Sequence, residues 1–273
     1  MTAQPLARSL TPEPAASLNL AHVLANRHWR WRAEPFPHVV AERVFTDEVY
    51  ASFAHELRSR LEGTWPADGP GFHRNMRGYD ALGMDFHPGW TGPLRFFLSR
   101  AWHDCIAEVF GVAASGHVSG GLHHHKPGSA SGQIHNDLNP GWFAEYESAD
   151  GIMVTRPDVC RYATGETEPP GLPVTEVVRG VAVLFYLENL SWSPGDGGTT
   201  GLYRGATDNV EVPVLEVAPR DNTLLAFECT PTSFHSFVRN RRHPRNSLIY
   251  WLHRPKADVV ARWGEAAIVH WSR

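Results

Sequence analysis

The sequence predicts a mainly β fold, a sandwich or jelly-roll barrel with helices near the N-terminus packed on one sheet. After Gly111, short runs of β-type residues alternate with clusters of turn residues at a spacing typical of such barrels. Before Gly111, two stretches repeat their apolar residues with a helical period. With 273 residues, 42% of them hydrophobic, the chain can bury a sizeable core within one domain.

Two helices and one strand are predicted ahead of the barrel. Thr46 is a plausible N-cap for a helix whose apolar residues, from Val49 to Leu61, follow a 3.6-residue period. A second helical pattern covers residues 94–110, and a strand bordered by prolines covers residues 35–40. These elements are expected to lean on the barrel.

The barrel itself is predicted as a double-stranded β-helix, a cupin-like jelly roll. Its expected strands cover residues 117–125, 133–137, 177–187, 210–217, 223–227, 233–238 and 246–253. The β-helix core then spans about residues 112–255 of a single domain, residues 19–273, and a flexible tail covers residues 1–18. Residues 138–176 carry several Gly and Pro and little periodicity, and so long a segment is predicted to be a lid insertion.

Composition narrows the classes of function. A net charge of −4 argues against a dominant nucleic-acid-binding surface. Cys105, Cys160 and Cys229 are widely spaced and odd in number, which disfavours a disulfide framework or a thiolate zinc site and fits a reducing cytoplasm. The longest apolar run, residues 181–187, is too short to span a bilayer, and residues 1–17 lack the apolar core of a signal peptide. We expect a cytoplasmic protein without nucleic-acid or membrane partners.

A histidine and a carboxylate are predicted to share one face of a strand. In an extended segment, residues two apart point to the same side, so His135 and Asp137 project together. One imidazole and one carboxylate placed in this way can share a metal ion. The pattern is short, and taken alone it is weak.

Three further residues follow near the C-terminus. His235 lies in an otherwise apolar strand, where a hydrogen-bonded core histidine is the ordinary interpretation. Arg245 follows ten residues later and Ser247 two after that. If the two strands form a hairpin that turns near Asn240, His235 and Arg245 lie side by side, and Ser247 shares the face of Arg245.

The ordered set of His135, Asp137, His235, Arg245 and Ser247 resembles the signature of the iron(II)/2-oxoglutarate-dependent oxygenase superfamily, especially its prolyl-4-hydroxylase-like branch. Further segments that match this family in order are residues 126–128, 179–189, 192–199 and 219–224. The resemblance covers roughly residues 35 to 255.

The resemblance implies a dioxygenase with Fe(II), 2-oxoglutarate and O2. His135, Asp137 and His235 would hold the iron, since two imidazoles and one carboxylate leave three adjacent positions open. Arg245 and Ser247 would bind the far carboxylate of 2-oxoglutarate, because a guanidinium matches a carboxylate with two parallel hydrogen bonds. The expected reaction is hydroxylation of an unactivated C–H, with release of succinate and CO2.

The substrate class stays open. An amino acid, another anionic small molecule or a natural-product intermediate is preferred, because the 138–176 insertion suits an enclosed pocket, with Trp142 and Arg161 as candidate substrate-binding residues. Prolyl or peptidyl hydroxylation of a protein is the second enzyme hypothesis. A non-catalytic β-barrel binding module is the third. Halogenation is disfavoured, because Asp137 is present where halogenases have a small residue.

Overall fold

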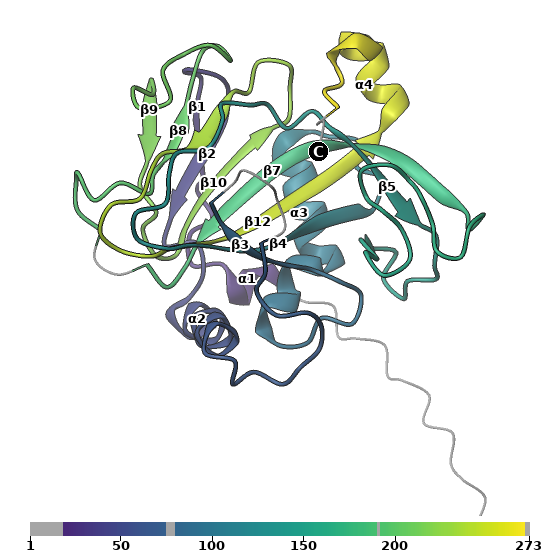
Figure 1. The fold of residues 1–273 in the computed structure, drawn as a ribbon, viewed down its shortest axis with the longest axis horizontal. Coiled ribbons are helices and arrows are strands. Elements are labelled where there is room, and N and C mark those ends of the chain that lie inside the picture. Colours follow the sequence, from purple (N-terminus) through teal and green to yellow (C-terminus); the bar gives the residue numbers. More distant parts are fainter. Residues whose placement is uncertain (1–18, 75–79, 190–191, 271–273) are drawn as a thin grey trace, which may run out of the picture.

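The computed structural model describes residues 19–74, 80–189 and 192–270, and it confirms the mainly β jelly roll (Figure 1). Its large sheet has nine strands. They are β1 (Arg30–Arg32), β2 (His38–Glu42), β3 (Leu82–Asp85), β4 (His117–His125), β5 (Pro140–Ala144), β6 (Met153–Val154), β7 (Val174–Tyr186), β10 (Thr223–Glu228) and β12 (Arg245–Pro255). A three-stranded sheet is formed by β8 (Thr200–Leu202), β9 (Leu215–Val217) and β11 (His235–Phe237).

One face of the large sheet is covered by the helices α1 (Leu20–Val23), α2 (Asp47–Leu61), η1 (Pro93–Leu98) and α3 (Arg100–Phe110). The C-terminal helices α4 (Lys256–Trp263) and η2 (Glu265–Ala267) pack instead against the apolar cluster of the other face. Strand β12 shows how the core is divided, since alternate residues of a strand face opposite sides. Leu248, Tyr250 and Leu252 pack in the apolar cluster that includes α2 and α3, whereas Ile249 and Trp251 pack against the second cluster, inside the barrel.

The first helix begins where the sequence predicts it, but the second prediction was wrong in one respect. The hydroxyl of Thr46 accepts a hydrogen bond from the Val49 amide, as an N-cap does. Residues 94–110 do not form one helix, because Ser99 has an extended backbone and separates η1 from α3. Its hydroxyl accepts a hydrogen bond from the Trp102 amide and so caps the start of α3.

Several predicted strands are confirmed, namely β4, β7, β10 and β12. The predicted strand 133–137 was wrong, because its regular pairing is limited to one bridge between His135 and His235. Residues 210–217 are a strand only over β9, and residues 233–238 only over β11.

The predicted hairpin near Asn240 was also wrong. β11 pairs with β8 in the small sheet, whereas β12 lies between β4 and β7 in the large sheet. Residues 239–244 therefore cross from one sheet to the other. Asn240 holds this crossing against the loop after β4, since its amide donates to the Ser129 carbonyl at 3.0 Å and its side chain to the Lys126 carbonyl at 3.1 Å.

The insertion contains more regular structure than its sequence suggests. β5 pairs with the start of β7 over residues 174–178, and β6 pairs with β4, so parts of residues 138–176 belong to the large sheet. The strand was missed because it opens with Pro140 and Gly141, which favour turns. A lid can therefore be sought only in the part of the insertion that follows β6 and precedes β7, residues 155–173.

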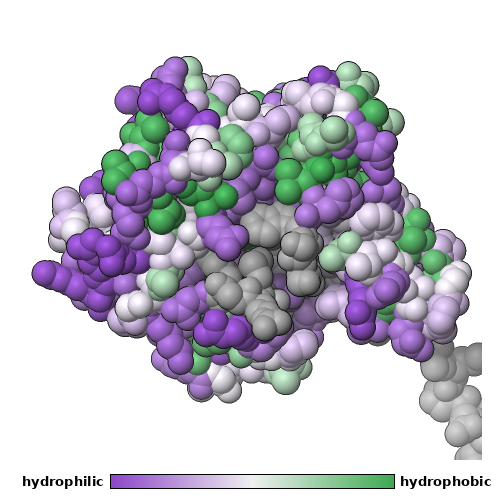
Figure 2. Space-filling view, turned by 45° about the horizontal axis from the view of Figure 1, so that its top comes forward, coloured by the Kyte–Doolittle hydropathy of each residue, from purple (hydrophilic) through white to green (hydrophobic). Residues whose placement is uncertain are grey.

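The predicted tail, residues 1–18, lies outside the described residues. Within the ranges that the structure describes, no helix is long and apolar enough to cross a membrane. On the face shown in Figure 2, apolar side chains lie in separate patches among polar ones.

One ion-pair network fastens α2 to the loop after it and leads to a stability prediction. Arg60 lies 2.8 Å from both Glu56 and Asp68, and its guanidinium stacks 3.9 Å from the Trp90 ring. The hydrogen bond from Arg60 holds the pKa of Asp68 well below its usual range, although burial acts in the opposite direction. A carboxyl with a depressed folded-state pKa stabilises the fold above its unfolded pKa, about 3.9, and loses that contribution as the pH falls.

We expect Asp68→Asn to lower the free energy of unfolding at pH 7 by about 1–3 kcal/mol. The difference in the free energy of unfolding between the two proteins should shrink below about pH 4, because protonation of Asp68 then begins to remove its stabilising contribution from the original protein. Urea unfolding at pH 7 and at pH 3 measures both. Asp158→Asn is the control, because that side chain is 72% exposed. An equal effect of the two substitutions would contradict the prediction.

Candidate metal and co-substrate site

Three residues from two segments far apart in the sequence meet between the two sheets. His135, Asp137 and His235 each offer one ligand atom, and these atoms all lie within 4.8 Å of one another. Paired backbone hydrogen bonds of 3.1 and 2.9 Å between His135 and His235 hold the two histidines side by side. His235 Nε2 lies 3.4 Å and His135 Nε2 3.9 Å from the carboxylate oxygens of Asp137.

The backbone orients both imidazoles for metal binding. His135 Nδ1 lies 2.7 Å from the Gln133 carbonyl, and His235 Nδ1 lies 3.1 Å from the Ser233 carbonyl. Because a carbonyl only accepts, each Nδ1 carries the hydrogen, and in the neutral ring Nε2 keeps its lone pair toward Asp137. Burial, assisted by His235, lowers the pKa of His135 to about 4, so this ring is neutral at pH 7. The donor set therefore fits a divalent metal of the first transition series.

Asp137 is held by two donors that the sequence did not reveal. Arg179 Nη1 donates to Oδ1 at 2.6 Å, and Trp251 Nε1 donates to Oδ2 at 2.7 Å. The Arg179 guanidinium also stacks 3.8 Å from the Trp251 ring. Burial alone would raise the pKa of Asp137, but Arg179 and the two histidines outweigh it and hold the pKa well below its usual range. The one available signal was an arginine in the otherwise apolar run 177–187.

A second buried arginine lies at the start of β12. Arg245 Nη1 donates to Ser247 Oγ at 3.0 Å, and Nη2 donates to Thr200 Oγ1 at 3.1 Å. Tyr186 donates to the same threonine at 2.7 Å, so Thr200 and Tyr186 join the predicted pair. Arg245 is only 3% exposed, and within the described ranges it has no acidic partner and its Nε no hydrogen-bond acceptor. Such a cation fits an anionic ligand.

Neighbouring histidines add no charge at this end of the barrel. Strand pairing places His125 opposite Arg245 and His123 opposite Ser247. Burial, followed by the charge of Arg245, lowers the pKa of His123 to about 4 and that of His125 well below its usual value. His124 points to the other side and hydrogen-bonds Asn246. Arg245 is thus the cation that an anion at this end would meet.

The two candidate substrate residues lie on the insertion. Trp142 is half-buried on β5, close to Gly165. The side chain of Arg161 is 77% exposed and lies 3.3 Å from Glu166. Neither has a hydrogen bond or ion pair to the three clustered residues in the described part of the chain. Their binding roles stay predictions.

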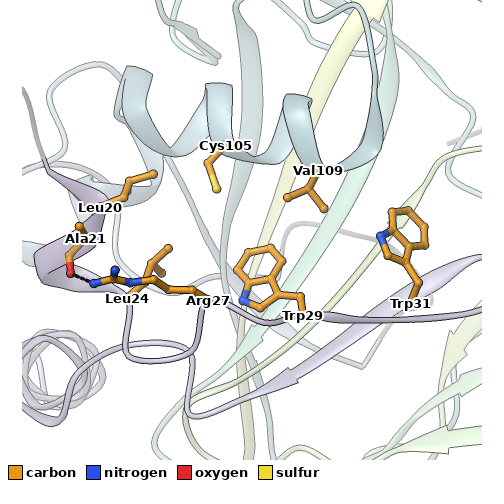
Figure 3. Close-up of a pocket in the computed structure, with 8 residues that line it drawn as sticks. All are labelled: Leu20, Ala21, Leu24, Arg27, Trp29, Trp31, Cys105 and Val109. Atoms are coloured by element: carbon orange, nitrogen blue, oxygen red, sulfur yellow. Dashed lines mark hydrogen bonds between the residues drawn. The ribbon is translucent and has the colours of Figure 1, made fainter.

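An apolar pocket of about 420 Å³ lies elsewhere (Figure 3). It is enclosed by Leu20, Leu24, Trp29 and Trp31 on one side and by Cys105 and Val109 of α3 on the other. None of the predicted site residues lines it. The candidate site is therefore defined by its convergent polar groups and not by this pocket.

Comparison with known proteins now identifies the class. Residues 161–253 match the family model of the 2OG-Fe(II) oxygenase superfamily. This segment contains His235, Arg245 and Ser247, and the fold brings His135 and Asp137 to it from outside the matched range. No curated protein matches the sequence.

Several solved structures are similar to this chain at low sequence identity. A prolyl hydroxylase from Trichoplax adhaerens, in complex with a peptide fragment of a hypoxia inducible factor, has a TM-score of 0.50 at 15% identity and covers 82% of this chain and 86% of its own. A prolyl-4-hydroxylase from Pseudomonas putida has a TM-score of 0.49 at 17% identity, over 80% and 92% of the two chains. A viral collagen prolyl hydroxylase from Paramecium Bursaria Chlorella virus-1 has a TM-score of 0.47 at 12% identity, over 79% and 95%.

The family match confirms the resemblance stated from the sequence. The chain is an enzyme of the dioxygenase class. The matched segment, residues 161–253, is similar to the 2-oxoglutarate- and Fe(II)-dependent oxygenases, whose name gives the co-substrate and the metal.

Proposed function

We propose that this enzyme is a hydroxylase whose Fe(II) is held by His135, Asp137 and His235, and whose 2-oxoglutarate is held by Arg245 and Ser247. The observation that carries the proposal is the meeting of two imidazoles and a carboxylate in a fold that also buries Arg245, a cation without an acidic partner among the described residues. When bound, iron, 2-oxoglutarate and O2 supply the oxidation of a C–H bond with release of succinate and CO2.

The chain's own residues bind, orient and exclude water. Arg179 and Trp251 fix both oxygens of Asp137, which limits the rotation of the carboxylate. Thr200 fixes the Arg245 guanidinium for an incoming carboxylate. Asp137, His235 and Arg245 are all at most 6% exposed and so are shielded from bulk water, whereas the His135 side chain is 29% exposed.

We propose a small anionic molecule, such as an amino acid, as the substrate. Arg161 of the insertion supports this choice, because its side chain is 77% exposed and a guanidinium matches a carboxylate. Peptidyl hydroxylation is the second candidate, since the Trichoplax prolyl hydroxylase holds a peptide. A binding module without catalysis is disfavoured by the complete ligand set. A cytoplasmic location remains a prediction from the cysteine count.

A succinate-release screen tests the proposal. The protein is given Fe(II), ascorbate and 2-oxoglutarate together with single amino acids, related metabolites or prolyl peptides. Release stimulated by a small molecule supports the preferred substrate class, and release stimulated only by peptides replaces it with the second candidate. No binding of Fe(II) or 2-oxoglutarate by the purified protein would contradict the function itself.

Arg179→Gln is expected to weaken metal binding by about tenfold, because groups that orient a metal ligand contribute on that scale. The physical reason is the loss of the 2.6 Å hydrogen bond to Asp137 Oδ1. Titration with Mn(II), followed by calorimetry, measures the affinity without turnover. Arg262→Gln on α4 is the control, since its side chain is 43% exposed. Unchanged Mn(II) affinity would show that Asp137 does not depend on Arg179.

The insertion supplies a further prediction for substrate binding. We propose that residues 155–173 cover the substrate, and that Arg161 then meets its acidic group. Arg161→Ala should raise the KM for an anionic substrate by roughly tenfold with little change for 2-oxoglutarate. Steady-state kinetics at fixed 2-oxoglutarate concentration measure this. Equal KM values in the original protein and in Arg161→Ala would show that another cation of the protein binds the acidic group of the substrate.

A further inference from the structure

One side chain of the insertion reaches the interior of the barrel. The hydroxyl of Tyr162 lies 2.7 Å from His253 Nε2 and accepts a hydrogen bond from Arg179 Nε at 3.3 Å. The ring packs edge-on to Phe143 of β5, with 5.6 Å between the ring centroids. Tyr162 thus connects the insertion to the arginine that holds Asp137.

The Tyr162 ring packs directly against Gly141 of β5. A Cβ atom added there would overlap the Tyr162 ring and its hydroxyl, so no other residue type fits without displacing the tyrosine. The Trp142 amide donates to the Tyr162 carbonyl at 2.9 Å, which ties the backbone of the loop to β5. The ring is therefore held from both its backbone and its tip.

The order of side chains along β12 shows where Tyr162 lies relative to the proposed co-substrate and metal sites. Arg245 marks the co-substrate end, and Trp251 contacts Asp137. His253, two residues further, contacts Tyr162. Two residues of a strand span about 7 Å. The Arg179 guanidinium contacts both the Tyr162 hydroxyl, at 3.3 Å, and Asp137 Oδ1, at 2.6 Å, so one guanidinium separates the tyrosine from the proposed metal ligand.

We propose that Tyr162 is a specificity-determining residue, whose ring forms the wall that limits how far a substrate can extend beyond the metal site. The inference rests on the proposed function. A free amino acid fits inside the wall, whereas a residue within a peptide needs space for a chain on both sides. The volume of the Tyr162 ring excludes the longer substrate. The hydroxyl orients the ring through its hydrogen bonds and does not set the size limit.

The test compares the original protein with Tyr162→Ala and Tyr162→Phe. The probes are free L-amino acids and the tripeptides that carry each of the same residues between two glycines. Succinate release with Fe(II) and 2-oxoglutarate is one measurement, and calorimetric binding to the protein loaded with Mn(II) and 2-oxoglutarate is the other. Thr164→Ala, an exposed position in the same loop, controls for disturbance of the loop.

We expect the original protein to prefer a free amino acid over its tripeptide by about tenfold or more, a discrimination that a pocket wall can supply. Tyr162→Ala should reduce the ratio to below about threefold by improving the tripeptide, because the obstructing volume is gone. Tyr162→Phe and Thr164→Ala should keep the original ratio.

Any of three results would contradict the proposed role of Tyr162. They are an unchanged preference for the free amino acid over its tripeptide in Tyr162→Ala, an equal loss of this preference in Tyr162→Phe, and no binding of either probe series to any variant. The proposed function fails on a different result, namely a protein that binds neither Mn(II) nor 2-oxoglutarate.

Discussion

His235→Ala is expected to abolish 2-oxoglutarate turnover and to weaken metal binding by more than about a hundredfold, since loss of a ligand exceeds the loss of a supporting group. The imidazole has no substitute, because the clustered ligand atoms found in the described ranges come only from His135, Asp137 and His235. Mn(II) titration and succinate release measure the two effects separately.

His55→Ala is the matched control, because that histidine is exposed on α2. It should leave both measurements unchanged. Stoichiometric iron and normal turnover in His235→Ala would show that the metal lies elsewhere. Circular dichroism of the metal-free variant checks that the fold is retained.

Arg245→Ala is expected to raise the KM for 2-oxoglutarate by roughly thirty- to a hundredfold, because removal of a charge-assisted pair costs about 2–3 kcal/mol. The side chain is 3% exposed, so water cannot easily replace it. Metal affinity should remain nearly intact, since Arg245 is hydrogen-bonded to Ser247 and Thr200 and not to a proposed metal ligand.

Arg245→Lys separates charge from shape. It keeps the positive charge but loses the planar fork, so its KM should lie between those of the original protein and Arg245→Ala. An unchanged KM for 2-oxoglutarate in Arg245→Ala would show that another cation binds the far carboxylate of 2-oxoglutarate.

Local patterns predicted the regular parts of the fold. Alternation of residues places Arg245 and Ser247 on one face of β12, and the structure confirms it by their 3.0 Å hydrogen bond. The N-cap at Thr46 was likewise a local signal. Neither depends on which strands become neighbours.

What the sequence missed depends on long-range packing. His235 and Arg245 were expected in one hairpin, but Asn240 binds the loop after β4 and sends the chain across to the second sheet. Arg179 and Trp251 meet at Asp137 from two different strands, and periodicity within either strand does not show that meeting. The resemblance to a known family predicted the candidate site residues, whereas periodicity within single strands could not bring them together.

The bridge between His135 and His235 joins two segments one hundred residues apart in the sequence. Closing so long a loop costs conformational entropy, and only a few backbone hydrogen bonds fasten its ends here. A metal held by both histidines would act as a reversible cross-link between the loop after β4 and the small sheet. Its binding energy would then count toward folding, so amide hydrogens on β8 and β11 should exchange more slowly in the metal-loaded protein.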